Sequence, residues 1–289
     1  MNNVIPLSIL IPSKNEERNL ENCLKPLVGW ANEIVLVDSQ STDKTLEIAS
    51  KFNEVKVLQF FYAGGYPKKR QWALDTYNFK NEWILLLDSD EILLPETKIE
   101  IEKAIQSKDF DGYWLKFNSF FLGRILKYGA TVLLKLSLFK IGKGKYEVRI
   151  ADQDITMGDM EVHEHVVVDG KVGKIKSPVR HENYNSLFRY IQKHNEYSNW
   201  DAAVYVNEDT NGEIKPSLWG SLPQRRRWLK VNLISMPGLP AFMFFYCYFF
   251  KLGFLDGRPG FYYSYFRGIQ ILQIKAKMYE LKLKSKTIN

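Results

Sequence analysis

WILLLDSDEILLP, residues 83–95, joins a wholly apolar run to a cluster of acidic residues. Trp83 and the four aliphatic residues after it are typical of a strand that is buried on both faces of a sheet. Asp88, Asp90 and Glu91 then follow within four positions. A strand suited to a dry interior therefore ends in three carboxylates, and this ending needs a physical reason.

The first 110 residues repeat one order, a short apolar strand followed by an amphipathic helix. Alternation of this kind predicts right-handed crossovers and an α/β fold with a mostly parallel sheet flanked by helices. The N-terminal segment lacks the basic start of a signal peptide, so we expect it to be the first strand. The expected strands are 7–12, 33–38, 55–61 and 83–88, and the expected helices are 15–28, a segment capped by 41–43, 67–77 and 95–106.

The pattern changes at Asp111, where 113–123 and 131–141 predict antiparallel strands or a hairpin. A long helix is expected over about 186–207, and 208–224 reads as a linker. We therefore predict a first domain over 1–215, divided at about residue 110, and a helical C-terminal region over 216–289.

Composition separates these two regions. Apolar residues make up 45% of the 289-residue chain, enough for a sizeable core, and the two cysteines are far apart, which favours a reducing compartment over a disulfide framework. Residues 216–289 carry 12 Lys and Arg against two acidic residues, and they hold 16 of the 41 aromatic residues. A basic, aromatic-rich segment favours an anionic partner surface, either a membrane or nucleic acid.

Four expected strands end in polar residues: 12–17, 38–41, 61–65 and 88–91. Ligands of doubly wound sheets bind at the carboxyl edge of the strands. Carboxylates gathered there repel one another unless a cation or hydrogen-bond donors compensate them. An isolated Asp-x-Asp would more simply cap the next helix, but four polar endings together predict a Mg²⁺ or Mn²⁺ site.

At this point the sequence resembles the inverting nucleotide-sugar glycosyltransferases of the GT-A fold, glycosyltransferase family 2. The resemblance covers roughly the first third of the chain and lies in IPSKNEERNLENCL, IVLVDSQSTDKTLEIA, KKRQWAL and LLLDSDE, at 11–24, 34–49, 68–74 and 85–91. A narrower resemblance, to bacterial lipopolysaccharide-core glucosyltransferases and capsule or O-antigen enzymes, lies in 162–164, 181–184, 190–202 and 253–265.

The resemblance implies a hexosyltransferase in which 1–110 is the nucleotide half and 111–215 the acceptor half of a catalytic domain. It places Pro12, Asn15 and Glu16 around the base and ribose, Asp38 on the base, and Arg70 near the phosphates of the donor. The expected donor is a UDP-sugar. Ser89, between the two aspartates, joins this nucleotide-sugar set. Lys68 and Lys69 are expected to be solvated at the start of a helix. Ser39 stands where the family commonly has a second aspartate.

The same resemblance assigns the metal and the base. Asp90 is expected to contact the metal directly, Asp88 to reach the ribose or a metal-bound water, and His181 to reach the metal or the diphosphate. Glu91 is expected only to support the loop. An inverting transfer needs one general base, for which the resemblance implies Glu164, with Glu161 as the alternative. Zinc at 163–165 is not expected, because two histidines two positions apart have no third ligand nearby.

The acceptor implied by the narrower resemblance is a lipid-linked saccharide. Residues 239–250 are too short for a simple span, but the basic, aromatic segment before them is typical of an interfacial anchor. We therefore expect a cytoplasmic enzyme that is bound peripherally to the inner membrane face through 225–284. The alternative is a helical appendage whose aromatic residues pack only as core. Nucleic acid is not expected as a partner, because no binding motif accompanies the charge.

Two other functions remain open. A sugar nucleotidyltransferase would need a glycine-rich basic loop after the first strand, where this chain has SKNEE. A binding protein without catalysis would not need Asp38, Asp88, Asp90 and Glu164 together.

Overall fold

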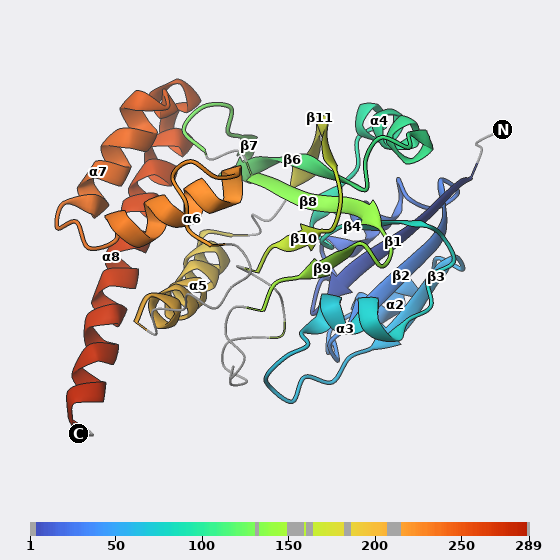
Figure 1. The fold of residues 1–289 in the computed structure, drawn as a ribbon, viewed down its shortest axis with the longest axis horizontal. Helices are drawn as coiled ribbons and strands as arrows, with labels where there is room; N and C mark the ends of the chain where they lie inside the picture. The colour runs from blue at the N-terminus through green and yellow to red at the C-terminus, as the bar shows by residue number, and fades with distance from the viewer. Residues whose placement is uncertain are drawn as a thin grey trace. The chain divides into compact units, whose positions relative to one another are not determined.

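The computed structural model describes residues 4–130, 133–148, 159, 164–181, 186–206 and 215–287. Within them, one sheet of nine strands has the order β3-β2-β1-β4-β8-β6-β11-β5, with β7 paired to β6, and β9 and β10 form a separate ribbon (Figure 1). The strands are β1 Ile5–Ser13, β2 Ala31–Asp38, β3 Val55–Gln59, β4 Trp83–Leu86, β5 Glu91–Ile92, β6 Gly112–Phe121, β7 Arg124–Ile125, β8 Leu133–Lys140, β9 Gly144–Tyr146, β10 Val166–Val168 and β11 Val172–His181.

The N-terminal part of the sheet is parallel, as predicted. β1 pairs in parallel with both β2 and β4, and β2 pairs in parallel with β3. The register places Ser13 opposite Asp38, and Asp38 opposite Gln59, so three strands end side by side. Beyond β4 the sheet becomes mixed, because β8 runs antiparallel to both β4 and β6, as the change of pattern at Asp111 predicts.

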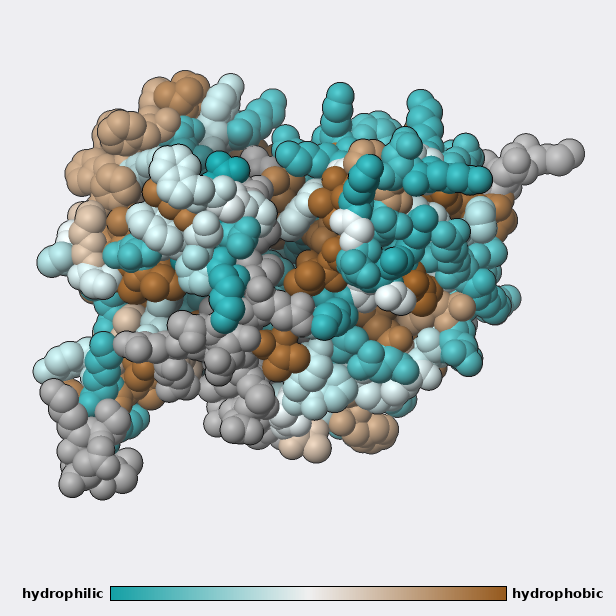
Figure 2. All heavy atoms as spheres, viewed as in Figure 1, coloured by the Kyte–Doolittle hydropathy of each residue, from teal (hydrophilic) through white to brown (hydrophobic). Residues whose placement is uncertain are grey.

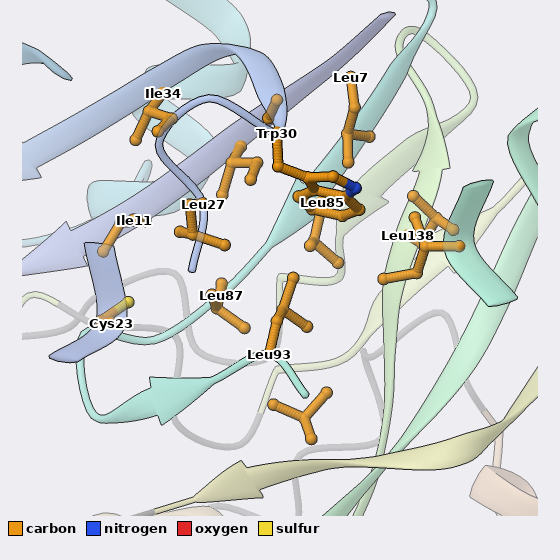
Figure 3. Packing of buried hydrophobic residues seen from close by; sticks show 14 of the residues in the cluster. Leu7, Ile11, Cys23, Leu27, Trp30, Ile34, Leu85, Leu87, Leu93 and Leu138 are labelled. Atoms are coloured by element: carbon orange, nitrogen blue, oxygen red, sulfur yellow. The ribbon is translucent and has the colours of Figure 1, made fainter. Parts of the chain in front are cut away.

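Alternate residues of these strands enter two separate cores. Leu7, Ile9 and Leu85 face one core together with α1 (Leu20–Leu24) and α4 (Pro95–Gln106), part of which Figure 3 shows. Leu10 and Ile84 face the other core, which includes Ala73 of α3 (Lys69–Thr76). Both faces of β4 are therefore covered, which explains its continuous apolar sequence.

Three expected elements are shorter than predicted. The helix expected over 15–28 is reduced to α1, with turns on either side and Pro26 just after it. Asn15 has a φ of 55°, and its backbone N–H donates to Ser41 rather than joining a helix. The strand expected over 83–88 ends at Leu86, and α2 (Thr45–Ala49) is also brief.

The chain forms two compact units. The first comprises 1–119, 132–146 and 152–183, and the second comprises 120–131, 147–151 and 184–289. This division differs from the expected boundary at residue 215, because α5 (Leu187–Val206) packs along α8 (Gly257–Thr287) in the second unit. That unit also contains α6 (Leu222–Leu233), α7 (Leu239–Phe245), the π-helical η2 (Tyr246–Phe250) and the 3₁₀ turn η3 (Gly253–Asp256).

No single described helix is both long and apolar enough to cross a membrane. Leu239–Phe250 and Gly253–Lys284 meet the length and composition only as a pair, and the two are bent by 72° at the break between them.

Candidate active site

The loops after β1 and β2 are joined by hydrogen bonds between their side chains and backbone. Glu16 N–H donates to Thr45 Oγ1, and Thr42 N–H donates to Asn15 Oδ1, both at 2.8 Å. Asn19 Nδ2 donates to Glu16 Oε2 at 2.7 Å. These bonds hold Asn15 and Glu16 at the carboxyl edge of the sheet, where they are expected.

Asp38, at the end of β2, is fully buried and held by three donors. Ser41 donates to it through its backbone N–H at 2.8 Å and its hydroxyl at 2.5 Å, and Gln59 Nε2 donates at 3.3 Å. The carboxylate therefore has a defined orientation at the strand edge. Its contact with a base stays a prediction.

A cavity of 290 Å³ opens beside Gln59. The segment after β3 and the first part of α3 line it, mostly with aromatic residues. Flat aromatic surfaces suit a planar or weakly polar ligand group. The lining residues are Gln59, Phe60, Phe61, Tyr62, Ala63, Gly64, Tyr66, Pro67 and Trp72.

The acidic segment after β4 is compensated by cations from elsewhere in the fold. Asp88 accepts from Arg70 of α3 and from Lys135 of β8, the latter at 2.6 Å. Lys135 Nζ also lies 2.5 Å from Glu91, whose other carboxylate oxygen accepts the Asp88 N–H at 2.8 Å. Ser89 Oγ donates to Pro12 O at 3.2 Å, which joins this turn to β1.

Charge around this turn determines the protonation of its members. Burial raises the pKa of Asp88, but Arg70 and Lys135 more than offset this and hold it well below its usual range. Burial and the neighbouring Asp88 raise the pKa of Glu91. Burial lowers the pKa of Lys135, yet the two carboxylates raise it above its ordinary value, so Lys135 stays charged.

His181 is brought to the same turn by strand pairing. β11 pairs antiparallel with β5, which places His181 opposite Glu91, and His181 Nε2 lies 3.3 Å from Asp90 Oδ1. Burial lowers the pKa of His181, but Asp90 and Glu91 outweigh it, so the pKa is raised above its usual value. The structure thus brings together Asp88, Asp90 and His181, the three residues expected at a metal.

One ligand atom each of Asp90, Glu91 and His181 lies within 4.8 Å of the others. Two carboxylates and one imidazole suit Mn²⁺, and the carboxylates alone suit Mg²⁺, so the donor set fits the expected ions. The grouping contains Glu91, which was expected to be a bystander, in place of Asp88. Asp88 instead pairs with Arg70 and Lys135. The metal roles themselves stay predictions.

Three consecutive basic residues at the start of α3 each reach a different acidic residue. Lys68 Nζ lies 3.4 Å from Glu164 Oε1, Lys69 Nζ lies 3.3 Å from Asp159, and Arg70 pairs with Asp88. Lys69 Nζ also donates to the carbonyl of Ser13 at 2.7 Å. The expectation that Lys68 and Lys69 are solvated is wrong, because both are fully buried.

Glu164 is buried and His165 is exposed, so the two point to opposite sides, as their alternation predicts. Glu161 and His163 lie outside the described residues. The site therefore has Glu164 as a described candidate base.

Sequence reasoning missed two features of the site, Lys135 and the pairing of Lys68 with Glu164. The signal for Lys135 is a lone charge within the apolar run LLKLSLF of β8. Asp159, the partner of Lys69, had no comparable local signal.

Comparisons with known proteins bear on the family and the fold of the chain. A model of the family described as "Glycosyl transferase family 2" matches residues 8–167. An uncharacterized glycosyltransferase of Rickettsia bellii (strain RML369-C) is 36% identical over 107 residues, 37% of this chain and 35% of that protein. Glycosyltransferase GlyG of Streptococcus pneumoniae serotype 4 is 30% identical over 112 residues, 36% of each chain.

The match spans about a third of the length of these curated relatives. Among solved structures, the mannosyltransferase PcManGT from Pyrobaculum calidifontis, in complex with GDP-Man and Mn²⁺, is similar with a TM-score of 0.54. That likeness covers 96% of this chain and 90% of the other at 13% identity, and it concerns the fold.

Proposed function

Because the chain belongs to glycosyl transferase family 2, we propose that it transfers a sugar from a nucleotide-diphosphate donor to an acceptor hydroxyl, with inversion at the anomeric carbon. One observation carries this proposal. The acidic turn after β4, two cations and His181 meet at the strand edge that also holds Asp38. A site of this kind combines a base pocket with the charges that a diphosphate needs.

In this proposal the base and ribose lie against the ends of β1 to β3. Asp38 is pre-oriented by Ser41 and Gln59, so it can accept from the N–H of a base such as uracil at little cost in side-chain entropy. The loop that holds Asn15 and Glu16, together with Pro12, borders the same edge. UDP-sugars are therefore the proposed donors.

The diphosphate lies between cations supplied by the chain. Arg70 presents a planar guanidinium and Lys135 a point charge, and both are held by Asp88 in the described structure. A Mg²⁺ or Mn²⁺ ion at Asp90, Glu91 and His181 would act as a Lewis acid on the phosphate oxygens. Arg70 and Lys135 stabilise the negative charge that builds on the leaving diphosphate.

Glu164 is the proposed general base. It takes the proton from the acceptor hydroxyl as that oxygen attacks the anomeric carbon opposite the leaving group. Lys68, at 3.4 Å, orients one carboxylate oxygen and stabilises its charge in a buried position. Glu161 is the alternative base.

We further infer that the acceptor is a lipid-linked saccharide of bacterial surface polysaccharide synthesis and that the enzyme acts at the inner membrane face. The support is the likeness of 181–184 and 253–265 to enzymes of lipopolysaccharide-core and capsule synthesis, and the basic composition of 216–289.

A donor panel tests the proposal. Purified protein is incubated with UDP- and GDP-sugars and Mn²⁺ or Mg²⁺, and both binding and hydrolysis of the donor are measured. Wild type should bind one donor class, and Asp90→Ala should weaken that binding. No binding of any nucleotide sugar by wild type would overturn the proposal.

Glu164→Gln separates an enzyme from a binding protein. It removes the base but keeps the side-chain shape, so donor binding should remain while transfer falls by at least about 100-fold. Transfer of a nucleotidyl group, detected as release of pyrophosphate, would instead identify a sugar nucleotidyltransferase.

A further inference from the structure

The second compact unit exposes a row of large apolar side chains along α7, η2, η3 and the start of α8. Phe250 is the most exposed of them, at 77%, and Tyr265, Phe245, Phe249 and Leu255 each have at least half of their surface exposed. We call the following residues the aromatic face: Phe242, Phe245, Tyr246, Phe249, Phe250, Leu252, Phe254, Leu255, Phe261, Tyr262 and Tyr265. Hydrophobic spheres gather over α7 at the upper left of Figure 2.

Ring contacts make most of this face one continuous surface. Phe245 stacks on Phe249 with ring centroids 5.9 Å apart, and Phe249 contacts Tyr248 at 5.1 Å. Tyr248 in turn contacts Phe254 at 6.3 Å and Phe261 at 5.6 Å, which links η2 to η3 and α8. A contiguous exposed apolar patch, unlike scattered single residues, marks an interaction surface.

Within the segment that carries the aromatic face, the exposed charges have one sign. Asp256 is the only acidic residue between 216 and 279. It is 1% exposed, and its carboxylate accepts the backbone N–H groups of Lys127, Tyr128 and Gly129 at 2.9 to 3.2 Å. No described acidic side chain of this segment therefore faces solvent.

Exposed basic residues, in contrast, flank the aromatic face along the chain. Arg258 is the second residue of α8, directly after η3, and Arg225 and Lys230 lie on α6, which precedes α7. An exposed apolar surface that has cations and lacks exposed acidic residues is complementary to an anionic lipid surface, where rings enter the interface and cations meet phosphates.

The helix geometry favours lying in the interface over crossing it. Leu239–Phe250 is too short to span, and it is bent by 72° from Gly253–Lys284. A short aromatic helix followed by a bend presents its rings at one depth, as interfacial segments do.

We propose that the aromatic face docks on an anionic lipid bilayer, with the rings of α7 and η2 buried at the level of the headgroups and Arg258 on lipid phosphate. This inference goes beyond sugar transfer, because lipid binding of this kind needs no donor, metal or Glu164.

Vesicle flotation of the full chain tests the proposal without any substrate. Vesicles of phosphatidylcholine with phosphatidylglycerol are compared with vesicles of phosphatidylcholine alone, at low and high salt. Wild type should bind the anionic vesicles more tightly, and high salt should weaken that binding because it screens exposed charges. The double variant Phe249→Ser/Phe250→Ser should bind at least about tenfold more weakly, since two interfacial rings are lost.

Two controls make the result specific. Phe188→Ser removes a ring that is 76% exposed on α5, outside the aromatic face, and should bind vesicles as wild type does. Arg258→Ala should weaken binding to anionic vesicles about fivefold and leave binding to neutral vesicles unchanged. Circular dichroism and thermal unfolding check that each variant is folded.

Three results would overturn the proposal: no binding of wild type to any vesicle, equal weakening by Phe188→Ser, or unchanged binding of the double variant.

Light scattering gives a further check. If the aromatic face instead joins two copies of the chain, wild type is a dimer, the double variant is a monomer, and neither floats with vesicles. Donor binding in vesicle-free buffer is measured separately, so failure of lipid docking is distinguishable from failure of the proposed sugar transfer.

Discussion

Lys135 is the cation on which the acidic turn depends. Its ammonium lies 2.6 Å from Asp88 and 2.5 Å from Glu91, and Glu91 is almost wholly buried. The same turn contains Asp90, so three carboxylates share one small volume. Arg70 and Lys135 are the described cations that pair with Asp88, and together they reduce the repulsion that carboxylates in a low dielectric would otherwise feel.

Lys135→Met should lower the free energy of unfolding by about 2 kcal/mol, less than for a fully buried pair because Lys135 keeps 30% of its side-chain surface exposed. Thermal unfolding measures the change. Added Mn²⁺ should stabilise the variant more than wild type, since it neutralises the same carboxylates.

Lys140→Met is the matched control on the same strand. Lys140 pairs with Glu82 and Asp111, whose side chains are 69% and 29% exposed. Its loss leaves neither carboxylate fully buried, as Glu91 is beside Lys135, so it should change stability less. Equal effects of the two substitutions would contradict the role given to Lys135.

The pair formed by Lys68 and Glu164 is a second prediction at this scale. Both side chains are buried, at 0% and 1% exposure, so Lys68→Met should cost about 3 kcal/mol of unfolding free energy by leaving a buried charge without its cation. Glu164→Gln removes that charge. The double variant should therefore be more stable than Lys68→Met alone, which a denaturant titration of all four proteins would reveal. Additive losses would mean that the two residues do not depend on each other.

At the scale of elements, α3 and β8 supply the cations that the acidic strand ends need. The start of α3 carries Lys68, Lys69 and Arg70 to acidic residues of three different segments. β8 enters the sheet antiparallel beside β4 and runs past its end, so Lys135 reaches the turn at 88–91. Asp88 and Asp90 thus lie in the turn after a parallel strand, and Glu91 begins β5. The cations that meet them lie on a helix and on an antiparallel strand.

The helix pair α5 and α8 gives a prediction on pH. His194 of α5 is held by Tyr190, whose carbonyl accepts at 2.8 Å and whose ring centroid lies 3.9 Å from the imidazole. Burial lowers the pKa of His194 to about 4. In the unfolded chain the imidazole of His194 becomes protonated below about pH 6.5, whereas in the folded chain it stays neutral down to about pH 4. The folded state therefore loses stability as the pH falls from about 6.5 towards 4.

His194→Gln removes this titration. The difference in unfolding free energy between wild type and His194→Gln should therefore change by up to about 1 kcal/mol per pH unit across that window, and should be constant above it. Denaturant unfolding at a series of pH values measures it. Parallel curves throughout would show that His194 has the same pKa in the folded and the unfolded chain, which would contradict the prediction.

At the scale of the molecule, the donor site and the aromatic face belong to two different compact units. The first unit contains the whole described acidic turn, Asp38 and Glu164. Ligand binding should therefore stabilise the protein through the first unit, and lipid binding should use the second.

The proposed donor with Mn²⁺, at about 100 times its dissociation constant, should add about 2.7 kcal/mol of stability and raise the melting temperature by roughly 5 to 10 °C. Differential scanning calorimetry measures the shift. A chelator should abolish it, and Asp90→Asn should reduce it. A full shift in the presence of the chelator would exclude a role for the metal in donor binding.

Much of the fold follows from local patterns. The apolar run of β4 predicted a strand covered on both faces, because its alternate residues enter two cores. Polar residues after β1, β2 and β4 predicted one shared edge, and the register of Ser13 with Asp38 confirms the alignment of the first two. The helix expected over 15–28 was too long, because bonds to the loop after β2 replace helical ones.

By itself the sequence determined the strands, their order of alternation and the acidic strand ends, since each depends on residues that are neighbours along the chain. Only the tertiary structure decided how those acids are compensated. Lys135 meets Asp88 and Glu91 from 47 and 44 positions away, and Lys68 meets Glu164 from a segment still farther along the chain. The local pattern predicted that Lys68 and Lys69 are solvated, because charged side chains leave water only when partners offset the cost of burial, and here those partners are distant along the chain.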